Sequence, residues 1–272
     1  MKKILITGGA GGLGLAATKY FSSRGWTVYA ADFNETALAD IGEKNVIALH
    51  MDVSKTESVD EAVRETAKTT DTLDGIVNFA GVMSMGSMIE SDTEIMRRIM
   101  DINLLGMYRV NRAFFEMVRK GEGRIINISS ECGIFSASPF NGFYATVKHA
   151  VETYSDALRR ETMFLGVPVI KIRPGAFRTN MQGSAEAMFD KLLAGTKYYP
   201  EVLGKMHVML KSGTAGAKDP AILAQVIYRA MTDKKPRLVY SANIDGKQKF
   251  MSSLPEKMQD RIYFSLFRDR KD

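Results

Sequence analysis

The feature that most constrains this chain is a regular alternation of short apolar runs with longer segments of helical periodicity. Seven runs, nearly continuous in apolar and β-branched residues, occupy residues 3–7, 27–31, 46–50, 75–81, 124–130, 167–175 and 236–241. Such runs are typical of parallel strands buried on both faces. Helical spacing of apolar residues marks 13–25, 56–69, 91–120, 142–166 and 219–233. The pattern predicts one doubly wound α/β domain, a Rossmann-type fold with a mostly parallel seven-stranded sheet flanked by helices.

Composition agrees with a single globular domain over residues 1–272, because 45% hydrophobic and 25% charged residues are ordinary values. The single cysteine, Cys132, excludes an internal disulfide and a cysteine-built metal site, and it fits a reducing cytoplasm. The three histidines are scattered, so we expect no metal. No apolar run approaches the roughly 18 residues of a membrane span, and we expect a soluble, cytoplasmic protein.

Charge is unevenly distributed along the chain. Between residues 234 and 272 there are ten Lys or Arg and five Asp or Glu, so +5 of the formal +6 lies in the last 39 residues. The nearly neutral remainder argues against a groove for nucleic acid. The basic C-terminal extension, from about 242 to 272, is either a solvated tail or a segment weakly attracted to an anionic membrane surface or an acidic substrate.

A glycine-rich loop, TGGAGGLG at 7–14, follows the first predicted strand and opens the first helix. Glycines there let the backbone approach a pyrophosphate, which would rest on free N–H groups of the helix. Asp32 ends the next strand, where a carboxylate can bind the adenosine ribose diol and repel a 2′-phosphate. The loop and the acid therefore predict NAD(H) in preference to NADP(H). Asp52, in MDVS, could meet the adenine amino group or serve as a helix cap or turn acid.

Tyr144 and Lys148, in YATVK, are four residues apart, so they share one face of a helix. They could form a partly exposed first turn with a snorkelling lysine, or a phenol held beside an ammonium group. A free tyrosine has a pKa of about 10, and a nearby cation lowers the cost of its phenolate. Such a pair could carry out general acid–base catalysis. The other motifs favour the catalytic interpretation.

With NFAG at 78–81 and INISS at 126–130 between them, the glycine loop and YATVK resemble the classical short-chain dehydrogenase/reductase family. The resemblance covers residues 2 to about 240. It implies an NAD(P)-dependent oxidoreductase that acts on CH–OH groups.

The glycine signature of that family, TGxxxGxG, is matched by Thr7, Gly8, Gly12 and Gly14. The spacing of the extended branch of the family, TGxxGxxG, also fits, through Gly11. The short chain favours the classical branch.

The resemblance implies four catalytic residues, Asn103, Ser130, Tyr144 and Lys148. Tyr144 would exchange the proton, Lys148 would also bind the nicotinamide ribose, and Ser130 would orient the substrate oxygen. Asn103 would hold a water that relays protons. Strand alternation separates Ser130 from its neighbour Ser129, although the gap from Ser130 to Tyr144 is one residue longer than the commonest family spacing.

The resemblance also implies a dinucleotide site, for which we expect these residues: Thr7, Gly8, Gly12, Leu13, Gly14, Asp32, Asp52, Val53, Asn78, Ala80, Gly81, Tyr144, Lys148, Pro174, Gly175 and Thr179. In NFAG, Phe79 departs from the second asparagine of the family's NNAG, a motif that mainly stabilises the sheet. Pro174 and Gly175 would turn the chain around the nicotinamide, and Thr179 would bind its carboxamide or a phosphate.

The segment from about 177 to 216 is too apolar for an idle connection, and we expect it to form a helical substrate lid. With MSMGSM at 83–88 it suggests an adaptable apolar pocket. The C-terminal extension resembles that of family members acting on steroids and retinoids. These features predict a secondary alcohol or ketone on a lipophilic skeleton, such as a hydroxysteroid, although the same apolar residues could pack the core or a subunit interface.

Two other functions stay open on the sequence. One is a retinol, sugar or other small-alcohol dehydrogenase with the same four residues. The other is a non-catalytic dinucleotide-sensing protein, which would usually lack the tyrosine or the lysine. The family resemblance also implies a homodimer or homotetramer built on the long helices that begin near Ser91 and Gly142.

Overall fold

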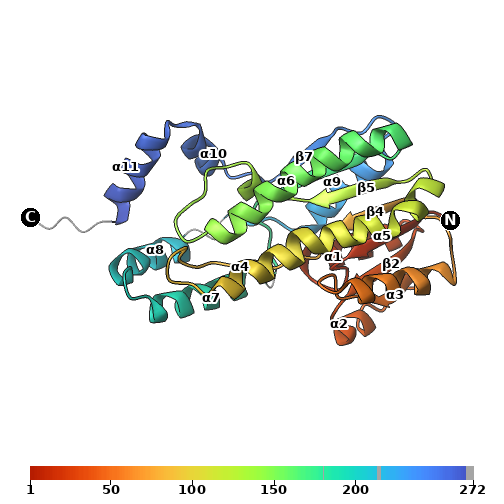
Figure 1. Cartoon of the computed structure of the whole chain (residues 1–272), viewed down its shortest axis with the longest axis horizontal. Helices are drawn as coiled ribbons and strands as arrows, with labels where there is room; N and C mark the ends of the chain where they lie inside the picture. Colours follow the sequence, from red (N-terminus) through yellow and green to blue (C-terminus); the bar gives the residue numbers. More distant parts are fainter. Residues whose placement is uncertain (180, 213–215, 268–272) are drawn as a thin grey trace, which may run out of the picture.

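The computed structural model describes residues 1–179, 181–212 and 216–267, with only the backbone described at 181–185 and 209–212. Its centre is a seven-stranded sheet in the order β3-β2-β1-β4-β5-β6-β7 (Figure 1). The strands are β1 (Lys3–Thr7), β2 (Thr27–Asp32), β3 (Val46–His50), β4 (Gly75–Asn78), β5 (Arg124–Ile128), β6 (Val169–Pro174) and β7 (Val239–Ala242). All six pairings are parallel, which confirms the predicted fold.

Helices cover both faces of the sheet (Figure 1). They are α1 (Gly12–Ser22), α2 (Glu35–Ala39), α3 (Thr56–Ala67), α4 (Thr93–Met100), α5 (Gly106–Lys120), α6 (Gly142–Thr162), α7 (Met181–Gly195), α8 (Pro200–Ser212), α9 (Pro220–Thr232), α10 (Gly246–Ser253) and α11 (Glu256–Phe267). Apolar side chains of α1 and α9 form one core with the sheet, and those of α3 and α5 form another on the opposite face. The two cores leave the central strands β1, β4 and β5 almost without exposed surface.

The N-termini of the helices differ in how their first N–H groups are bonded. Four helices, α2, α4, α9 and α10, begin at an Asn or Asp whose side chain accepts a hydrogen bond from a backbone N–H of the first turn. Helix α1 follows Gly11 instead and has no side-chain cap. Its first N–H groups are therefore available to an anion, at the crevice where the strand order reverses between β1 and β4.

Two differences from the sequence prediction go beyond shifted ends of the other strands and the unpredicted helices α2, α10 and α11. The helix predicted over 91–120 is interrupted by a π-helical turn, Asp101–Leu105, between α4 and α5. Strand β7 begins at Val239 rather than at Pro236, a residue that has no N–H to give to a neighbouring strand. The segment 177–216 contains α7 and α8, in keeping with the expected helical segment, while its residue 180 and residues 213–215 lie outside the described part.

Neither a membrane-spanning helix nor a metal-binding cluster occurs among the described residues. None of their helices is both long and apolar enough to cross a bilayer. Nor do these residues contain a group of three or more His, Cys, Asp or Glu side chains that could hold a metal ion.

Candidate active site

The glycine loop fits a closely bound dinucleotide because its glycines are required by geometry. Gly8 and Gly12 have positive φ angles of 66° and 47°. A Cβ on Gly14 would overlap the carbonyl oxygen of Gly8, whereas a Cβ on Gly11 would meet nothing within 4 Å. Glycine is therefore required at Gly12, which only the classical spacing contains, and not at Gly11, which only the extended spacing contains. Because these positions carry no side chains, a ligand can approach the backbone of the loop.

Asp32 lies beside this loop, as the sequence predicts. One carboxylate oxygen accepts a hydrogen bond from the Ala10 N–H at 3.2 Å and the other from the Asn34 N–H at 3.1 Å. Each oxygen keeps acceptor capacity for further donors. The carboxylate is thus positioned at the loop and could accept hydrogen bonds from a ribose diol.

Asp52 and Val53 have partners within the protein. The Asp52 carboxylate accepts hydrogen bonds from the backbone and hydroxyl of Ser54, at 2.9 and 2.7 Å, and it forms an ion pair with Lys55. The Val53 carbonyl accepts a hydrogen bond from Arg109. Asp52 therefore acts as a turn acid in this structure, and the adenine contact of these two residues stays a prediction.

Thr7 connects the glycine loop to the NFAG segment. Its hydroxyl accepts the Ala80 N–H at 3.0 Å, and the backbone at 79–80 lies against Gly8. Leu13, at the start of α1, is partly buried against the core. The residues at 78–81 thus line the crevice with their backbone.

The Asn78 side chain lies in a buried polar network and does not face the cleft. Its amide donates to Asn111 at 2.7 Å and to Asn127 at 2.9 Å. Asn127 in turn donates to Ser155, and Asn111 to the Tyr154 hydroxyl. The network joins β4, β5 and α5 to α6. Asn78 therefore supports the sheet, the role that the family motif implies for it.

Asn103 occupies the π-helical turn and is buried. Its amide holds both backbone groups of Val82, because its oxygen accepts the Val82 N–H at 2.7 Å and its nitrogen donates to the Val82 carbonyl at 2.8 Å. The extra backbone residue of a π turn is frequent at functional sites. Asn103 thus fixes the segment after Gly81, and its role in a proton relay stays a prediction.

The structure brings Ser130, Tyr144 and Lys148 together. Ser130 follows β5 and is hydrogen-bonded to the Tyr144 hydroxyl, while its own oxygen accepts the Cys132 N–H at 3.2 Å. Tyr144 and Lys148 lie in the first two turns of α6, and the lysine Nζ is 5.6 Å from the centre of the tyrosine ring. The same Nζ donates to the Ile128 carbonyl at 3.1 Å. The predicted pairing of the three side chains is therefore present.

Burial dominates the protonation of this pair. It raises the pKa of Tyr144 well above the ordinary value, and the hydrogen bond from Ser130 opposes the shift only in part. It lowers the pKa of Lys148 to about 8, against the effects of Cys132 and Glu152. The direction for Tyr144 is opposite to the one expected from the lysine alone. The protein without cofactor therefore holds a neutral phenol beside a largely protonated amine at neutral pH.

The turn after β6 closes the other side of the crevice. Gly175 donates its N–H to the Ala242 carbonyl at 2.9 Å, and a Cβ on Gly175 would overlap the carbonyl of Asn243. Thr179 lies next to Gly12, since its side chain would be 3.7 Å from a Cβ there. The turn that begins at Pro174 thus returns to the glycine loop, and the nicotinamide contact of these residues stays a prediction.

The connection between α7 and α8 is attached to the loops around Tyr144. The Glu90 carboxylate accepts hydrogen bonds from the N–H groups of Lys197 and Tyr198, at 2.7 and 2.9 Å, and from the Thr196 hydroxyl. Phe140, four residues before Tyr144, packs edge-on against Tyr199. These contacts hold the segment between α7 and α8 over the loop that leads to Tyr144.

The C-terminal extension is attached to the segment between Ser130 and Tyr144. The Glu131 carboxylate accepts the Asp245 N–H at 2.7 Å, and Ser136 donates its N–H to the Ser252 hydroxyl at 2.9 Å. The Ser138 hydroxyl is 3.3 Å from that of Tyr263. Helices α10 and α11 therefore border the site.

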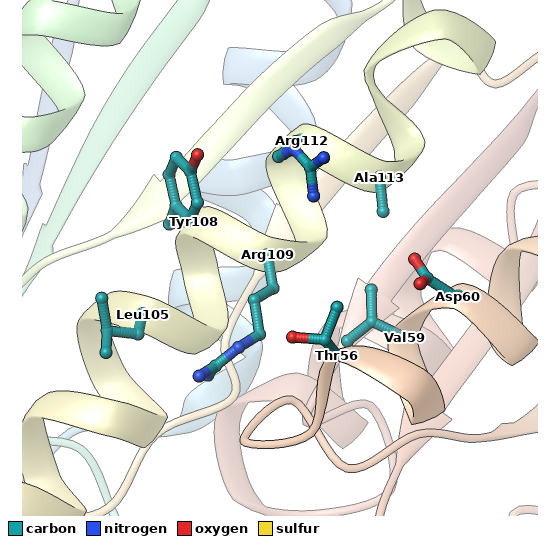
Figure 2. Close-up of a pocket in the computed structure, with 8 residues that line it drawn as sticks. All are labelled: Thr56, Val59, Asp60, Leu105, Tyr108, Arg109, Arg112 and Ala113. Atoms are coloured by element: carbon teal, nitrogen blue, oxygen red, sulfur yellow. The ribbon is translucent and has the colours of Figure 1, made fainter.

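A separate hollow of about 180 Å³ lies between α3 and α5 (Figure 2). Its lining residues are Thr56, Val59, Asp60, Leu105, Tyr108, Arg109, Arg112 and Ala113. The Arg109 guanidinium is already bound to Asp101 and to the Val53 carbonyl. The hollow contains none of the predicted site residues, so it is distinct from the candidate active site.

Sequence reasoning missed three carboxylates near the site, Glu90, Glu131 and Glu152. Glu131 directly follows Ser130, and Glu152 follows Lys148 by one helical turn, so spacing alone could have singled out both. Two cations, Lys171 and Arg173, at alternate positions of an otherwise apolar strand, also point to a buried carboxylate opposite. Glu90 gave no such signal.

Comparison with known proteins identifies the relatives of this chain. The family model described as short chain dehydrogenase matches residues 2–189. Retinol dehydrogenase 7 of Mus musculus is 32% identical, covering 97% of this chain and 88% of that protein. Human 17-beta-hydroxysteroid dehydrogenase type 6 is 31% identical, covering 96% and 87%. The mitochondrial D-beta-hydroxybutyrate dehydrogenase of Bos taurus is 30% identical, covering 96% and 83%.

Solved structures share the fold. A short-chain dehydrogenase from Streptomyces avermitilis superimposes with a TM-score of 0.77 at 25% identity, covering 97% of this chain and 95% of that one. A protein from Burkholderia phymatum in complex with NAD gives 0.74 at 22% identity, covering 88% of both chains. One from Burkholderia cenocepacia in complex with NADP gives 0.74 at 19%, covering 99% and 100%. Both dinucleotides thus occur among structures of this fold.

The glycine loop gives a matched pair of variants. We expect Gly14→Ala to weaken NADH binding about tenfold or more, because the added methyl group overlaps the Gly8 carbonyl and overpacking of this kind costs about 1–3 kcal/mol. Gly11→Ala, whose methyl group meets open space, should bind NADH as the wild type does. Fluorescence titration with NADH measures both. Equal affinities for the two variants would contradict the assignment of this loop as the pyrophosphate site.

Proposed function

Because the chain belongs to the short-chain dehydrogenase family, we propose that it interconverts a secondary alcohol and a ketone with NAD(H) as the hydride carrier. Family membership makes the chain an oxidoreductase that acts on CH–OH groups, with a nicotinamide dinucleotide as cofactor. The observation that carries the proposal is the convergence of Ser130, Tyr144 and Lys148 after β5, at the same edge of the sheet as the glycine loop that follows β1.

The proposed mechanism follows from the protonation of these side chains. A nicotinamide, when bound, accepts or gives the hydride. In the direction of oxidation, Ser130 orients the alcohol oxygen and Tyr144 takes its hydroxyl proton as a general base. Lys148 lowers the cost of the phenolate and binds the nicotinamide ribose. In the direction of reduction, the buried neutral phenol of Tyr144 gives the proton to the carbonyl oxygen.

We propose NAD(H) as the preferred dinucleotide on the basis of Asp32. Its carboxylate is held at the glycine loop by backbone donors, where it would accept hydrogen bonds from a ribose diol. A 2′-phosphate at the same place would meet this negative charge. The remaining expected dinucleotide contacts, at 7–14, 78–81 and 174–179, belong to the same proposal.

The proposed substrate is lipophilic, with a hydroxysteroid as the first candidate. The loops and helices that border Tyr144 carry partly exposed apolar side chains, which are Met88, Ile89, Ile134 and Tyr198. Two of the relatives are named for retinol and for a hydroxysteroid. A smaller alcohol is the second candidate, because other relatives of similar identity are named for hydroxybutyrate. The helices α7 and α8 would then act as the substrate lid. The side chains of Met181 and Met209, also expected there, lie outside the described part.

We further propose that α10 and α11 form a membrane-contacting arm. Helix α11 carries Lys257, Arg261 and Phe264 at helical spacing on one exposed face, and Phe264 is 60% exposed. On α10, Phe250 is 65% exposed beside Lys249. Basic helices with exposed aromatic residues bind anionic lipid surfaces. The arm lies at one end of the molecule beside α8 (Figure 1). Residues 268–272 lie outside the described part.

The cytoplasmic location stays a prediction. We also propose a homodimer or homotetramer through α4, α5 and α6, where Leu105 and Tyr108 are about half exposed. A monomeric mass in light scattering would contradict that assembly.

The catalytic proposal is tested by coupled absorbance assays with NAD(H) and NADP(H) over a panel of steroids, retinoids, sugars and 3-hydroxybutyrate. We expect turnover of a lipophilic alcohol, faster with NAD, and a loss of about 10²–10⁴-fold in kcat/KM for Tyr144→Phe. Asp32→Ala should reduce the preference for NAD about tenfold, since charged hydrogen bonds contribute about 1.5–3 kcal/mol.

Turnover that survives in Tyr144→Phe would overturn the mechanism. Activity confined to sugars or 3-hydroxybutyrate would refute the lipophilic substrate only. Tight NADH binding without any turnover would favour the dinucleotide-sensing alternative.

The membrane arm is tested by co-sedimentation with phosphatidylcholine vesicles, with and without phosphatidylserine. We expect binding only to the anionic vesicles, weakened at least about tenfold in Lys257→Glu/Arg261→Glu, because each basic residue contributes about 1 kcal/mol. Phe264→Ser should weaken it as well, whereas the control Phe164→Ser changes an 81% exposed side chain outside the arm. Equal loss in the control, or no binding by the wild type, would contradict the proposal.

A further inference from the structure

An ionic cluster, nearly buried at Lys171 and Glu152 and partly exposed at Arg173 and Asp156, joins α6 to β6. Arg173 makes a two-pronged contact with the Glu152 carboxylate, with nitrogen–oxygen distances of 2.8 and 2.7 Å. Lys171 Nζ lies 2.9 Å from Glu152 and 2.9 Å from Asp156. The side chains of Lys171 and Glu152 are only 8% and 10% exposed. The strand thus directs two cations into the interface with the helix that carries Tyr144 and Lys148.

Stability alone does not explain this cluster. Burying charges costs several kcal/mol per ion, and replacing a buried ion pair by apolar residues is often neutral or stabilising. The neighbouring strand residues Ile170 and Ile172 are fully apolar and buried. Apolar side chains at 171 and 173 could pack against α6 without the cost of burying charge. The cluster points to a use for the charge itself.

The position of the cluster relates it to the reaction. Tyr144, Lys148, Glu152 and Asp156 are each four residues apart, so they form one stripe along α6. Lys148 is hydrogen-bonded to Ile128 of β5, and Ile128 is paired in register with Ile172, between the two cations of β6. This stripe of α6 therefore lies over the paired strands β5 and β6, and Glu152 is one helical turn after Lys148.

We propose that Glu152 is a positioning residue for the proposed reaction, a fixed negative charge that keeps Lys148 in its ammonium form beside Tyr144. Arg173 and Lys171 hold its carboxylate in place, so the charge cannot move toward solvent. The inference rests on the proposed function of Tyr144 and Lys148.

The groups around the stripe shift the pKa values of Glu152, Lys148 and Tyr144 in the following directions. Burial raises the pKa of Glu152, but the contacts with Arg173 and Lys171 outweigh it and leave the carboxyl ionised. On Lys148, burial lowers the pKa to about 8, while Cys132, from the turn after β5, and Glu152 raise it. Cys132 does so only as a thiolate, and burial raises the pKa of that thiol, so Glu152 is the carboxylate charge that acts on Lys148 in this pH range. Cys132 and Glu131 also face Tyr144, where they oppose the phenolate.

The test uses variants of opposite sign at one ion pair. Glu152→Gln removes the negative charge, so the high-pH limb of kcat/KM in the oxidation direction, where Lys148 loses its proton, should move about one unit lower. Lys171→Met leaves the Glu152–Arg173 pair in place, and the limb should stay or move higher. Glu161→Gln, an exposed carboxylate of the same helix, should leave the profile unchanged.

A structural role would not produce opposite signs. If both Glu152→Gln and Lys171→Met move the limb lower, or if Glu152→Gln leaves it unchanged, the proposal is overturned. Thermal unfolding identifies variants that do not fold. If Glu152→Gln is among them, Asp156→Asn replaces it, and we expect a smaller shift in the same downward direction.

The pH dependence of NADH binding, measured by fluorescence, separates this inference from the proposed function. Lys148 is expected to contact the nicotinamide ribose, so loss of its proton should weaken binding at a lower pH in Glu152→Gln than in the wild type. A wild type without turnover would end the proposed function while the binding profiles still decide the role of Glu152.

Discussion

The rest of the site depends on the burial of two ionisable side chains one helical turn apart. Desolvation disfavours the charged form of each, so in the protein alone Tyr144 is a neutral phenol and Lys148 is a weakened base with a pKa of about 8. The same burial strengthens every nearby charge, because the local dielectric constant is low. A cation that arrives next to Tyr144 therefore has a large effect on the phenol. Burial thus keeps Tyr144 protonated in the protein alone and makes its pKa sensitive to the charge of a bound cofactor.

Such a pair is useful only if its helix cannot move. Two polar systems fasten α6 to the sheet and to α5, C-terminal to Tyr144 and Lys148. The amides of Asn111 and Asn127 bind Tyr154 and Ser155, and the cations of β6 bind Glu152. The amide contacts are neutral, and they fix the position of α6 relative to the sheet. The second system is charged, and we assign it the further task of supporting Lys148. The segment 196–199 and the C-terminal helices α10 and α11 border this base.

The fold could be predicted from the sequence because parallel strands buried on both faces leave an unambiguous apolar pattern, as in 3–7 and 75–78. The positions of Ser130, Tyr144 and Lys148 followed from motif order and spacing. The pKa direction of Tyr144 could not be foreseen, since burial of a single hydroxyl depends on packing from several elements. The amide contacts of Asn103 with Val82 and the attachment of the α7–α8 turn by Glu90 join residues whose pairing leaves no periodic signal in the sequence.

The central claim is that positive charge at the nicotinamide position converts a suppressed phenol into a base. The most direct measurement is the ultraviolet difference titration of phenolate in the wild type against Tyr144→Phe, with and without NAD⁺. The account predicts that Tyr144 does not ionise below about pH 10 in the free protein and ionises near neutral to mildly alkaline pH with NAD⁺ bound. An ionisation curve that is the same in both states would contradict it.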